Sequence, residues 1–344
     1  MADYDVVVIG AGNGGLTAAA HLARKGVNVL LLERHNIPGG CATSFCRGRF
    51  EFEVALHQLS GMGSPEYPGP LRGLLDRLGV MDKLEFVPMT DLYRITVRDE
   101  LDLVLRPDWS ETIGILQKQF PGEKENIQGF FDFVKAYFVE VINAFYLNDP
   151  ETSREKYPKF FKYALRSTQE VLDGYFSDPV LKYVLSAYWG YMGLPPRYLA
   201  FNDMATLIFA YMEFKPYHLK GGSQAMSNAI ADAVLSSGGT IRYNCGAKKI
   251  IVENGAVRGV VTDNGDEIST DFVISNASKI STYMELLDPE HVPEGVLPEL
   301  RQSTISQSGF CVYMGLGCTP AEAGIPESTH FISQSTNIDR GYEK

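Results

Sequence analysis

The N-terminal segment contains the feature that most constrains the fold. Residues 5–9 form a run dominated by β-branched apolar residues, and residues 27–33 form a second largely apolar run. Between them, small and apolar residues recur at helical spacing over 13–25, and Gly26 is a plausible C-terminal stop. Strands that are apolar throughout are typical of a parallel sheet covered by helices on both faces. The order strand, glycine turn, helix, strand therefore predicts a βαβ unit.

The turn of this unit, residues 10–15, matches the pattern G-x-G-x-x-G. Gly10 permits the tight turn, Gly12 lets the backbone approach a pyrophosphate, and Gly15 allows the helix to pack closely on the strand. The free N–H groups and the dipole of the helix then face the phosphates. Glu33 follows about 20 residues later, where a carboxylate accepts hydrogen bonds from an adenosine ribose and would repel the 2′-phosphate of NADP. We predict a dinucleotide site; the alternative is that the glycines serve only a tight turn.

A second pair of glycines, Gly39 and Gly40, follows the strand that ends in Glu33. Paired glycines at this point let the chain run close along a second length of cofactor. A nicotinamide dinucleotide does not need this extension, whereas the ribityl and isoalloxazine parts of a flavin dinucleotide do. The pair therefore favours a flavin.

The middle of the chain has a different texture. Alternating apolar residues over 93–97 and 101–105 predict an antiparallel hairpin. From about 110 to 215 the chain is helical and rich in aromatic residues. Apolar side chains recur there at spacings of three and four, on one stripe made of Ile127, Phe130, Phe131, Val134, Phe138, Val141, Ile142 and Phe145. This part predicts an aromatic helical insert.

After residue 220 the α/β texture returns, with a helix over 225–235 and a strand over 240–243. Asn-Gly turns separate short alternating runs between 249 and 268, which predicts a β-meander. Residues 271–277 are predicted to form a strand that returns to the parallel sheet. A further strand is expected at 310–315, in the sheet of the second, substrate-binding domain.

These patterns predict an α/β fold in which a Rossmann-like parallel sheet with a β-meander is interrupted by an α+β domain. The length of 344 residues suggests two domains at roughly 150 residues each. We expect the dinucleotide domain to comprise 1–75 and 216–280, and a substrate domain to comprise 76–215 and 281–344.

Four segments resemble one family of flavoproteins, the phytoene desaturase, carotenoid isomerase and retinol saturase family. They are residues 5–57, 189–196, 219–225 and 273–277, in the family's order. The resemblance spans nearly the whole chain and implies an FAD-dependent oxidoreductase. It also implies a C-terminal segment that begins Gly-Asp and closes the FAD site; none is found before Lys344, so this chain is expected to lack it.

The resemblance implies a set of cofactor contacts. Gly10, Gly12 and Gly15 would hold the FAD pyrophosphate, and Glu33 would bind the adenosine ribose. Gly39, Gly40 and Thr43 would line the path toward the flavin, and the backbone of Ala247 would contact the adenine. Gly14 and Arg34 complete the predicted site, and His57 is the one titratable side chain placed near the flavin, as a catalytic candidate. Glu53 and Ala55 stand where the family usually has Asp and Gly, so backbone packing near the flavin is expected to differ.

The implied reaction is hydride or electron exchange at the flavin, acting on a long apolar polyene or isoprenoid by desaturation, saturation or isomerisation. Trp189, Tyr191 and Tyr211 are candidates to line an apolar channel, with core packing as the alternative for each. Two other hypotheses stay open. The chain is a flavin amine oxidase or protoporphyrinogen oxidase relative, or it is a non-catalytic flavin-fold fragment that acts as a binding partner.

Charge and cysteine content restrict the kinds of partner, compartment and metal site that this chain is expected to have. With 31 Lys plus Arg against 42 Asp plus Glu, the net charge is −11, which argues against nucleic acid. The five cysteines are scattered without metal-ligand spacing, so a reducing, cytoplasmic compartment and no metal site are expected. No apolar stretch reaches the ~20 residues of a spanning helix.

Residues 154–166 form a basic-aromatic stretch in this acidic chain. Cations attracted to anionic lipid, with aromatic rings dipping into the interface, predict peripheral membrane contact there. The alternative is a solvated helix face whose aromatic rings pack inward.

Overall fold

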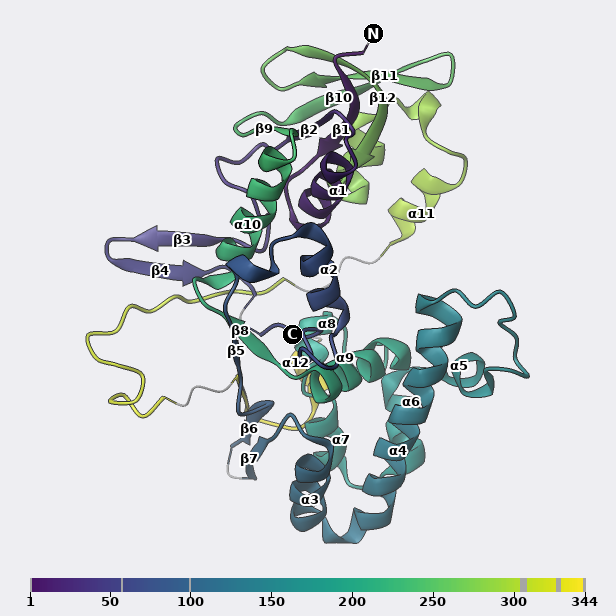
Figure 1. Cartoon of the computed structure of the whole chain (residues 1–344). Coiled ribbons are helices and arrows are strands. Elements are labelled where there is room, and N and C mark those ends of the chain that lie inside the picture. The colour runs from purple at the N-terminus through teal and green to yellow at the C-terminus, as the bar shows by residue number, and fades with distance from the viewer. Residues whose placement is uncertain (1, 57, 99, 304–307, 326–328, 343–344) are drawn as a thin grey trace. The chain divides into compact units, whose positions relative to one another are not determined.

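The first unit is built on the sheet that the N-terminal pattern predicts. The structure is a computed structural model and describes residues 2–56, 58–98, 100–303, 308–325 and 329–342 (Figure 1). Six strands lie in the order β10-β11-β12-β1-β2-β9. Their bounds are β1 Tyr4–Ile9, β2 Val29–Leu32, β9 Thr240–Arg242, β10 Ala247–Glu253, β11 Ala256–Thr262 and β12 Glu267–Ser275. The pairs β12–β1, β1–β2 and β2–β9 are parallel, and β10–β11–β12 is an antiparallel meander, so the predicted fold class is confirmed.

Strand β12 is one continuous strand, whereas the sequence pattern predicted two separate strands, at 267–268 and at 271–277. Its first part pairs with β11, where Val260 faces Ile268, and its second part pairs with β1, where Val8 faces Ile274. One strand thus serves both the meander and the parallel sheet, because the two partners use different lengths of it.

Two helices of the first unit pack on the sheet and against each other. They are α1 (Asn13–Arg24) and α10 (Gly222–Ser236), which contact β1, β2 and β9 (Figure 1). The core-facing side of α1 includes Ala19, Ala20 and Ala23, whose small side chains allow close packing. The unit also contains β3 Ser44–Arg47, β4 Phe50–Glu53, α2 Pro70–Leu78, η1 Met81–Lys83, η4 Ser281–Leu286, η5 Pro289–His291 and α11 Val296–Gln302.

The second unit combines a small sheet with a helical layer. Strands β6 (Tyr93–Val97) and β7 (Leu101–Leu105) form the predicted antiparallel hairpin, and β13 (His330–Ser333) lies parallel to β6. Its helices are α3 Trp109–Gln119, η2 Pro121–Glu123, α4 Lys124–Val141, η3 Ile142–Tyr146, α5 Pro158–Tyr163, α6 Thr168–Tyr175, α7 Pro179–Leu185, α8 Trp189–Met192, α9 Phe201–Phe214 and α12 Ile338–Tyr342. The remaining sheet has two strands, β5 (Phe86–Pro88) and β8 (Tyr217–Leu219).

The aromatic stripe predicted along α4 forms the centre of the second core. Phe130, Phe131 and Val134 are fully or almost fully buried, and Phe130 makes edge contacts with Phe176 and other rings. Phe145, predicted on the same stripe, is instead 63% exposed. The α-helix ends at Val141 and continues as a π-helix, whose wider turn shifts the phase of the stripe.

The prediction of a strand at residues 310–315 is wrong. This segment has no regular secondary structure, and Phe310 is 93% exposed. A continuous run of apolar residues indicates an extended segment but does not say which strand it pairs with. Both edges of β6 are taken by β7 and β13, so the small sheet has a different third strand from the one expected.

The chain divides into two units whose boundaries differ from the expected ones. The first unit is Met1–Leu59, Pro70–Val87 and His218–Ile305; the second is Ser60–Gly69, Pro88–Tyr217 and Ser306–Lys344. Residues 76–87 and 281–305 thus belong to the first unit, although the sequence pattern assigned them to a substrate domain. The reason is packing: α2 crosses the expected boundary and contacts α1, and η4 packs against β10.

A buried carboxylate gives the second unit an expected acid sensitivity. Glu123 accepts hydrogen bonds from Asn126 Nδ2 (2.6 Å), from Ser177 N and Oγ (both 2.7 Å) and from Asp178 N (3.0 Å). These bonds, that of Asn126 first, lower the pKa of Glu123 from 4.5 to about 2. Because the folded-state pKa is depressed, the stabilisation is complete above pH 4.5 and is lost as the pH falls toward about 2.

We expect Glu123→Ala to lower the free energy of unfolding of this unit by about 2–4 kcal/mol, because several donors lose their acceptor. Denaturant unfolding at pH 7 followed by Trp fluorescence measures this, with the exposed Glu155→Ala as control. Equal stability of the two variants at pH 7 would contradict the role given to Glu123.

Candidate dinucleotide site

The glycine turn between β1 and α1 has the geometry that its sequence predicts. Gly10 has φ +90°, a conformation that side chains disfavour, and its N–H donates to the Leu32 carbonyl (2.8 Å). A Cβ at Gly15 would overlap the carbonyl oxygen of Gly10. Gly12 is the N-cap of α1 and provides no side-chain cap, and no acidic residue lies in the first turn. The helix therefore begins with N–H donors directed to an anion-binding position.

Glu33 lies at the carboxyl end of β2 and is 8% exposed. Its Oε2 accepts from Ala11 N (2.6 Å), inside the glycine turn, and its Oε1 accepts from His35 N (2.8 Å). Each carboxylate oxygen keeps a second lone pair for a further donor. The turn and the predicted ribose acceptor are thus joined into one rigid group.

The second glycine pair lies beside the first. Gly39 forms a parallel bridge with Gly12, and its N–H donates to the Ala11 carbonyl (2.8 Å). A Cβ at Gly40 would lie 3.2 Å from Gly12 Cα, and Gly40 itself has φ +62°. Two glycine segments that are separated in sequence therefore form one continuous backbone surface.

Helix α10 fixes this second segment through two residues that the sequence pattern did not single out. Gln224 Nε2 donates to the Pro38 carbonyl (3.1 Å), and Ser227 Oγ donates to the Ala42 carbonyl (2.7 Å). The hydroxyl of Thr43 donates to Gln224 Oε1 (2.5 Å), so in this structure it is engaged with the protein. Gln224 lies in the 219–225 segment already noted as a family landmark, which is the signal that points to it.

Arg34 and Ala247 lie on neighbouring segments at the end of β2. The N–H of Cys245 donates to the Glu33 carbonyl (2.9 Å), and that of Asn244 donates to the His35 carbonyl (3.0 Å). The chain therefore runs alongside residues 33–35 before Ala247 opens β10. Arg34 is exposed there.

The longer side chain of Glu53 has a local role. Its carboxylate accepts from Ser223 N (2.7 Å) and from Ser223 Oγ (2.6 Å), in the first turn of α10. A negative charge at a helix N-terminus is stabilising. Ala55 is exposed, and His57, the catalytic candidate, lies outside the described residues.

The three aromatic candidates of the second unit are differently placed. Tyr211 is buried and stacks on Tyr188, with ring centroids 5.1 Å apart. Tyr191 is 41% exposed and lies 5.6 Å from the ring of Phe331. Trp189 is half-buried against the same core. Tyr211 therefore packs in the core, and Tyr191 faces the surface.

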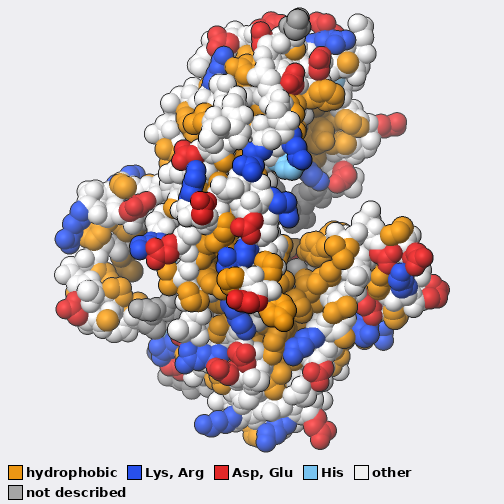
Figure 2. Space-filling model, in the orientation of Figure 1, with side chains coloured by type: hydrophobic (Ala, Val, Ile, Leu, Met, Phe, Trp, Pro, Cys, Tyr) orange, Lys and Arg blue, Asp and Glu red, His pale blue; other side chains and the backbone are white. Residues whose placement is uncertain are grey.

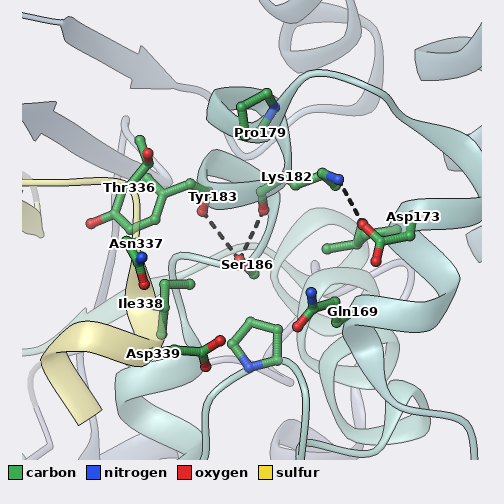
Figure 3. Close-up of a pocket in the computed structure, with 12 residues that line it drawn as sticks. Gln169, Asp173, Pro179, Lys182, Tyr183, Ser186, Thr336, Asn337, Ile338 and Asp339 are labelled. Atoms are coloured by element: carbon green, nitrogen blue, oxygen red, sulfur yellow. Dashed lines mark hydrogen bonds and ion pairs between the residues drawn. The ribbon is translucent and has the colours of Figure 1, made fainter. Parts of the chain in front are cut away.

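A pocket of about 420 Å³ in the second unit is lined by residues of α6, α7 and the start of α12 (Figure 3). Lys182 points to Asp173, with an Nζ–Oδ1 distance of 2.6 Å, and Ser186 Oγ donates to the Lys182 carbonyl (2.8 Å). Polar groups dominate this lining, and two of them, Lys182 and Asp173, form an ion pair. The pocket does not offer the apolar surface that a polyene requires.

Two further properties bear on the class of site. Within the part of the chain that the structure describes, no group of three His, Cys, Asp or Glu side chains is placed to hold a metal ion. Among the described helices, none is both long enough and apolar enough to cross a membrane.

The geometry defines the class of protein as an α/β protein with a Rossmann-like parallel sheet, in which two glycine segments form one backbone surface. The family described as flavin-containing amine oxidoreductases matches residues 14–331, so the chain belongs to this family, which implies a flavin cofactor.

Two curated relatives share this similarity. The chain is 27% identical over 303 residues to the chloroplastic prolycopene isomerase of Daucus carota, covering 85% of this chain and 49% of the relative. It is 27% identical over 365 residues to the all-trans-retinol 13,14-reductase of Danio rerio, covering 98% and 58%. The chain thus spans about half the length of the curated relatives it matches. The resemblance to the carotenoid and retinoid group of flavoproteins is confirmed.

A solved structure shows the same fold. An oxidoreductase from Methanosarcina mazei matches with a TM-score of 0.62 at 21% identity, over 86% of this chain and 65% of that one. At this identity the match speaks for the fold alone.

Proposed function

We propose that the flavin is FAD and that the first unit binds it. The residues assigned to the cofactor are Gly10, Gly12, Gly14, Gly15, Glu33, Arg34, Gly39, Gly40, Thr43 and Ala247. The observation that carries the proposal is the bridge between Gly12 and Gly39, which makes one backbone surface from the uncapped start of α1 to the second glycine pair. Such a surface suits a cofactor that continues beyond its pyrophosphate.

The residues at this surface fit the chemistry of FAD. Backbone N–H groups at the start of α1 are donors for pyrophosphate oxygens, and Glu33 is an acceptor for ribose hydroxyls. Glycine at 39 and 40 keeps side chains away from the path toward the flavin, since both have positive φ. The buried carboxylate of Glu33 is unfavourable to a 2′-phosphate, so NADP fits poorly.

We further propose that the substrate is a long apolar polyene or isoprenoid, which is desaturated, saturated or isomerised. The names of the two relatives refer to prolycopene and to all-trans-retinol, both conjugated polyenes, which supports this substrate class. A bound flavin supplies hydride or electron exchange, and the protein supplies position and exclusion of water. His57 remains a proposed catalytic residue.

An amine is the second candidate substrate class, because the family takes its description from flavin-containing amine oxidoreductases. The test uses the purified chain loaded with FAD, mixed anaerobically in parallel with retinol, a carotene and a polyamine. Bleaching of the flavin absorbance by retinol or the carotene, or a change in the polyene spectrum, supports the first proposal. Bleaching by the polyamine alone would replace it with an amine oxidase.

Peripheral membrane contact through residues 154–166 is also proposed. Fewer cations of this segment are available for lipid than the sequence indicates, because two of them pair with carboxylates. Lys156 pairs with Asp149 (2.8 Å), and Lys159 pairs with Glu140 (3.1 Å). Leu165 is 97% exposed in the same segment. Figure 2 shows hydrophobic side chains beside charged ones on the part of the second unit that carries α4 and α5. A mixed apolar and cationic surface of this kind suits an anionic interface.

We expect the double variant Lys162→Glu with Leu165→Glu to bind anionic vesicles about tenfold or more weakly, because a surface cation contributes about 1 kcal/mol and an apolar contact is lost as well. Co-sedimentation with phosphatidylserine vesicles measures this. Lys124→Glu, at the start of α4, is the matched control. Equal sedimentation of the double variant and the control would contradict membrane contact at this segment.

A further inference from the structure

Asn276 lies at a special position of the six-stranded sheet. Strand β12 ends at Ser275, which faces Ile9 of β1, and the N–H of Asn276 donates to the Ile9 carbonyl (2.8 Å). Asn276 and Gly10 are therefore the first residues beyond the carboxyl ends of two adjacent parallel strands. The chain leaves β1 through α1 to β2 on one side, whereas β12 lies on the other side. In open α/β sheets, ligands bind at such a switch point.

The glycine turn surrounds the side chain of Asn276. A Cβ at Gly12 would lie 2.9 Å from Asn276 Nδ2, and a Cβ at Gly14 would lie 2.6 Å from Asn276 Oδ1. A Cβ at Gly15 would lie 3.1 Å from Asn276 Cβ. Three glycines of the turn thus lie against one side chain, and two of them face its carboxamide. Gly12 and Gly14 have a second reason to be glycine, because any larger residue would displace this side chain from the start of α1.

The carboxamide of Asn276 is available to a ligand. The residue is exposed, and its side chain makes no hydrogen bond with any residue that the structure describes. Its Nδ2 carries two donor hydrogens and its Oδ1 is an acceptor. It lies at the start of a helix that has no side-chain cap of its own. A donor that bonds to none of the described residues therefore lies beside the N–H groups already assigned to the pyrophosphate.

We propose that Asn276 is a phosphate-binding residue of the dinucleotide site, with Nδ2 donating a hydrogen bond to a pyrophosphate oxygen. This inference rests on the proposed FAD-binding function. The site then receives donors from two directions: backbone N–H groups from α1, and a neutral side chain from the end of β12. A carboxylate at 276 would keep the shape of the residue but repel the phosphates.

The experiment compares Asn276→Ala and Asn276→Asp with the wild-type chain, using FAD, ADP and adenosine as ligands in calorimetric titrations. Loss of a hydrogen bond to a charged group is expected to weaken FAD and ADP about tenfold or more in Asn276→Ala. Asn276→Asp is expected to weaken both by more than about 100-fold, because repulsion is added. Adenosine, which has no phosphate, is expected to bind all three proteins equally.

The control is Gln302→Glu, which makes the same neutral-to-negative change at the exposed end of α11 in the first unit. Circular dichroism checks that each variant is folded. If Asn276→Ala unfolds, Asn276→Ser, which keeps a short hydrogen-bond donor, replaces it. We expect Asn276→Ser to lose less affinity for FAD than Asn276→Asp. Folded variants that bind FAD and ADP as the wild type does, or that lose adenosine equally, overturn the role of Asn276 and leave FAD binding intact. A wild-type chain that binds neither FAD nor ADP would instead refute the proposed function and this inference with it.

Discussion

Replacing Gly15 with alanine is expected to weaken FAD binding by more than about 100-fold and to destabilise the first unit by about 3 kcal/mol. The added Cβ would overlap the carbonyl oxygen of Gly10, which is backbone and cannot move aside as a flexible side chain can. Helix α1 would have to shift away from β1, which would misplace its first N–H groups. A fluorescence titration with FAD and denaturant unfolding measure the two effects.

The matched control is Gly73→Ala, in helix α2 of the same unit. A Cβ there meets only the Nη1 atom of Arg77 at 3.6 Å, an ordinary contact. Alanine in place of a helical glycine stabilises by about 0.5–1 kcal/mol, so this variant is expected to be at least as stable as the wild type and to bind FAD normally. If Gly15→Ala behaved like Gly73→Ala, the close approach of α1 and β1 would not be what positions the cofactor.

The second large effect is expected from Glu33→Ala. The substitution removes the acceptor of Ala11 N, which is buried, and of His35 N, and it removes the proposed partner of the ribose. We expect a loss of about 2–4 kcal/mol in the free energy of unfolding of the first unit, and FAD affinity lowered by about 100-fold. Glu33→Gln keeps one acceptor oxygen and is expected to fall between the wild type and Glu33→Ala.

Glu267→Ala serves as the control for Glu33, because Glu267 is exposed at the start of β12 in the same sheet. It is expected to change stability by no more than about 0.5 kcal/mol and to leave FAD binding unchanged. An FAD affinity of folded Glu33→Ala equal to that of this control would mean that Glu33 has only a structural role.

Local sequence patterns predicted the parts of the fold whose signals are local. The βαβ unit up to Glu33 and the hairpin of β6 and β7 depend on short-range periodicity and on turn glycines, and both are found. The pattern could not show that α4 changes into a π-helix at Ile142, because the apolar spacing continues unbroken to Phe145. Residues 310–315 were misassigned to a strand for another reason: an apolar run does not show whether the chain finds a partner strand.

The candidate site divides in the same way. The glycines and Glu33 are recognisable because a motif fixes their spacing within one segment. Ser227 is not, because it contacts Ala42, more than 180 positions away in the chain; Gln224 lies in a landmark segment, but its contact with Thr43 is equally distant in sequence. Asn276 is brought to the glycine turn by the pairing of β12 with β1, which no spacing rule predicts. Sequence thus indicates the cofactor class, and only the fold shows which distant side chains lie beside the glycine segments.

Binding of FAD to the first unit is tested most directly by titrating FAD into the purified wild-type chain and following the quenching of flavin fluorescence, with ADP, NAD and NADP as competitors. We expect saturable binding of one FAD per chain, displacement of FAD by ADP, and little or no displacement by NADP. A folded chain that leaves flavin fluorescence unchanged at saturating FAD, or that binds NADP more tightly than FAD, would contradict this expectation.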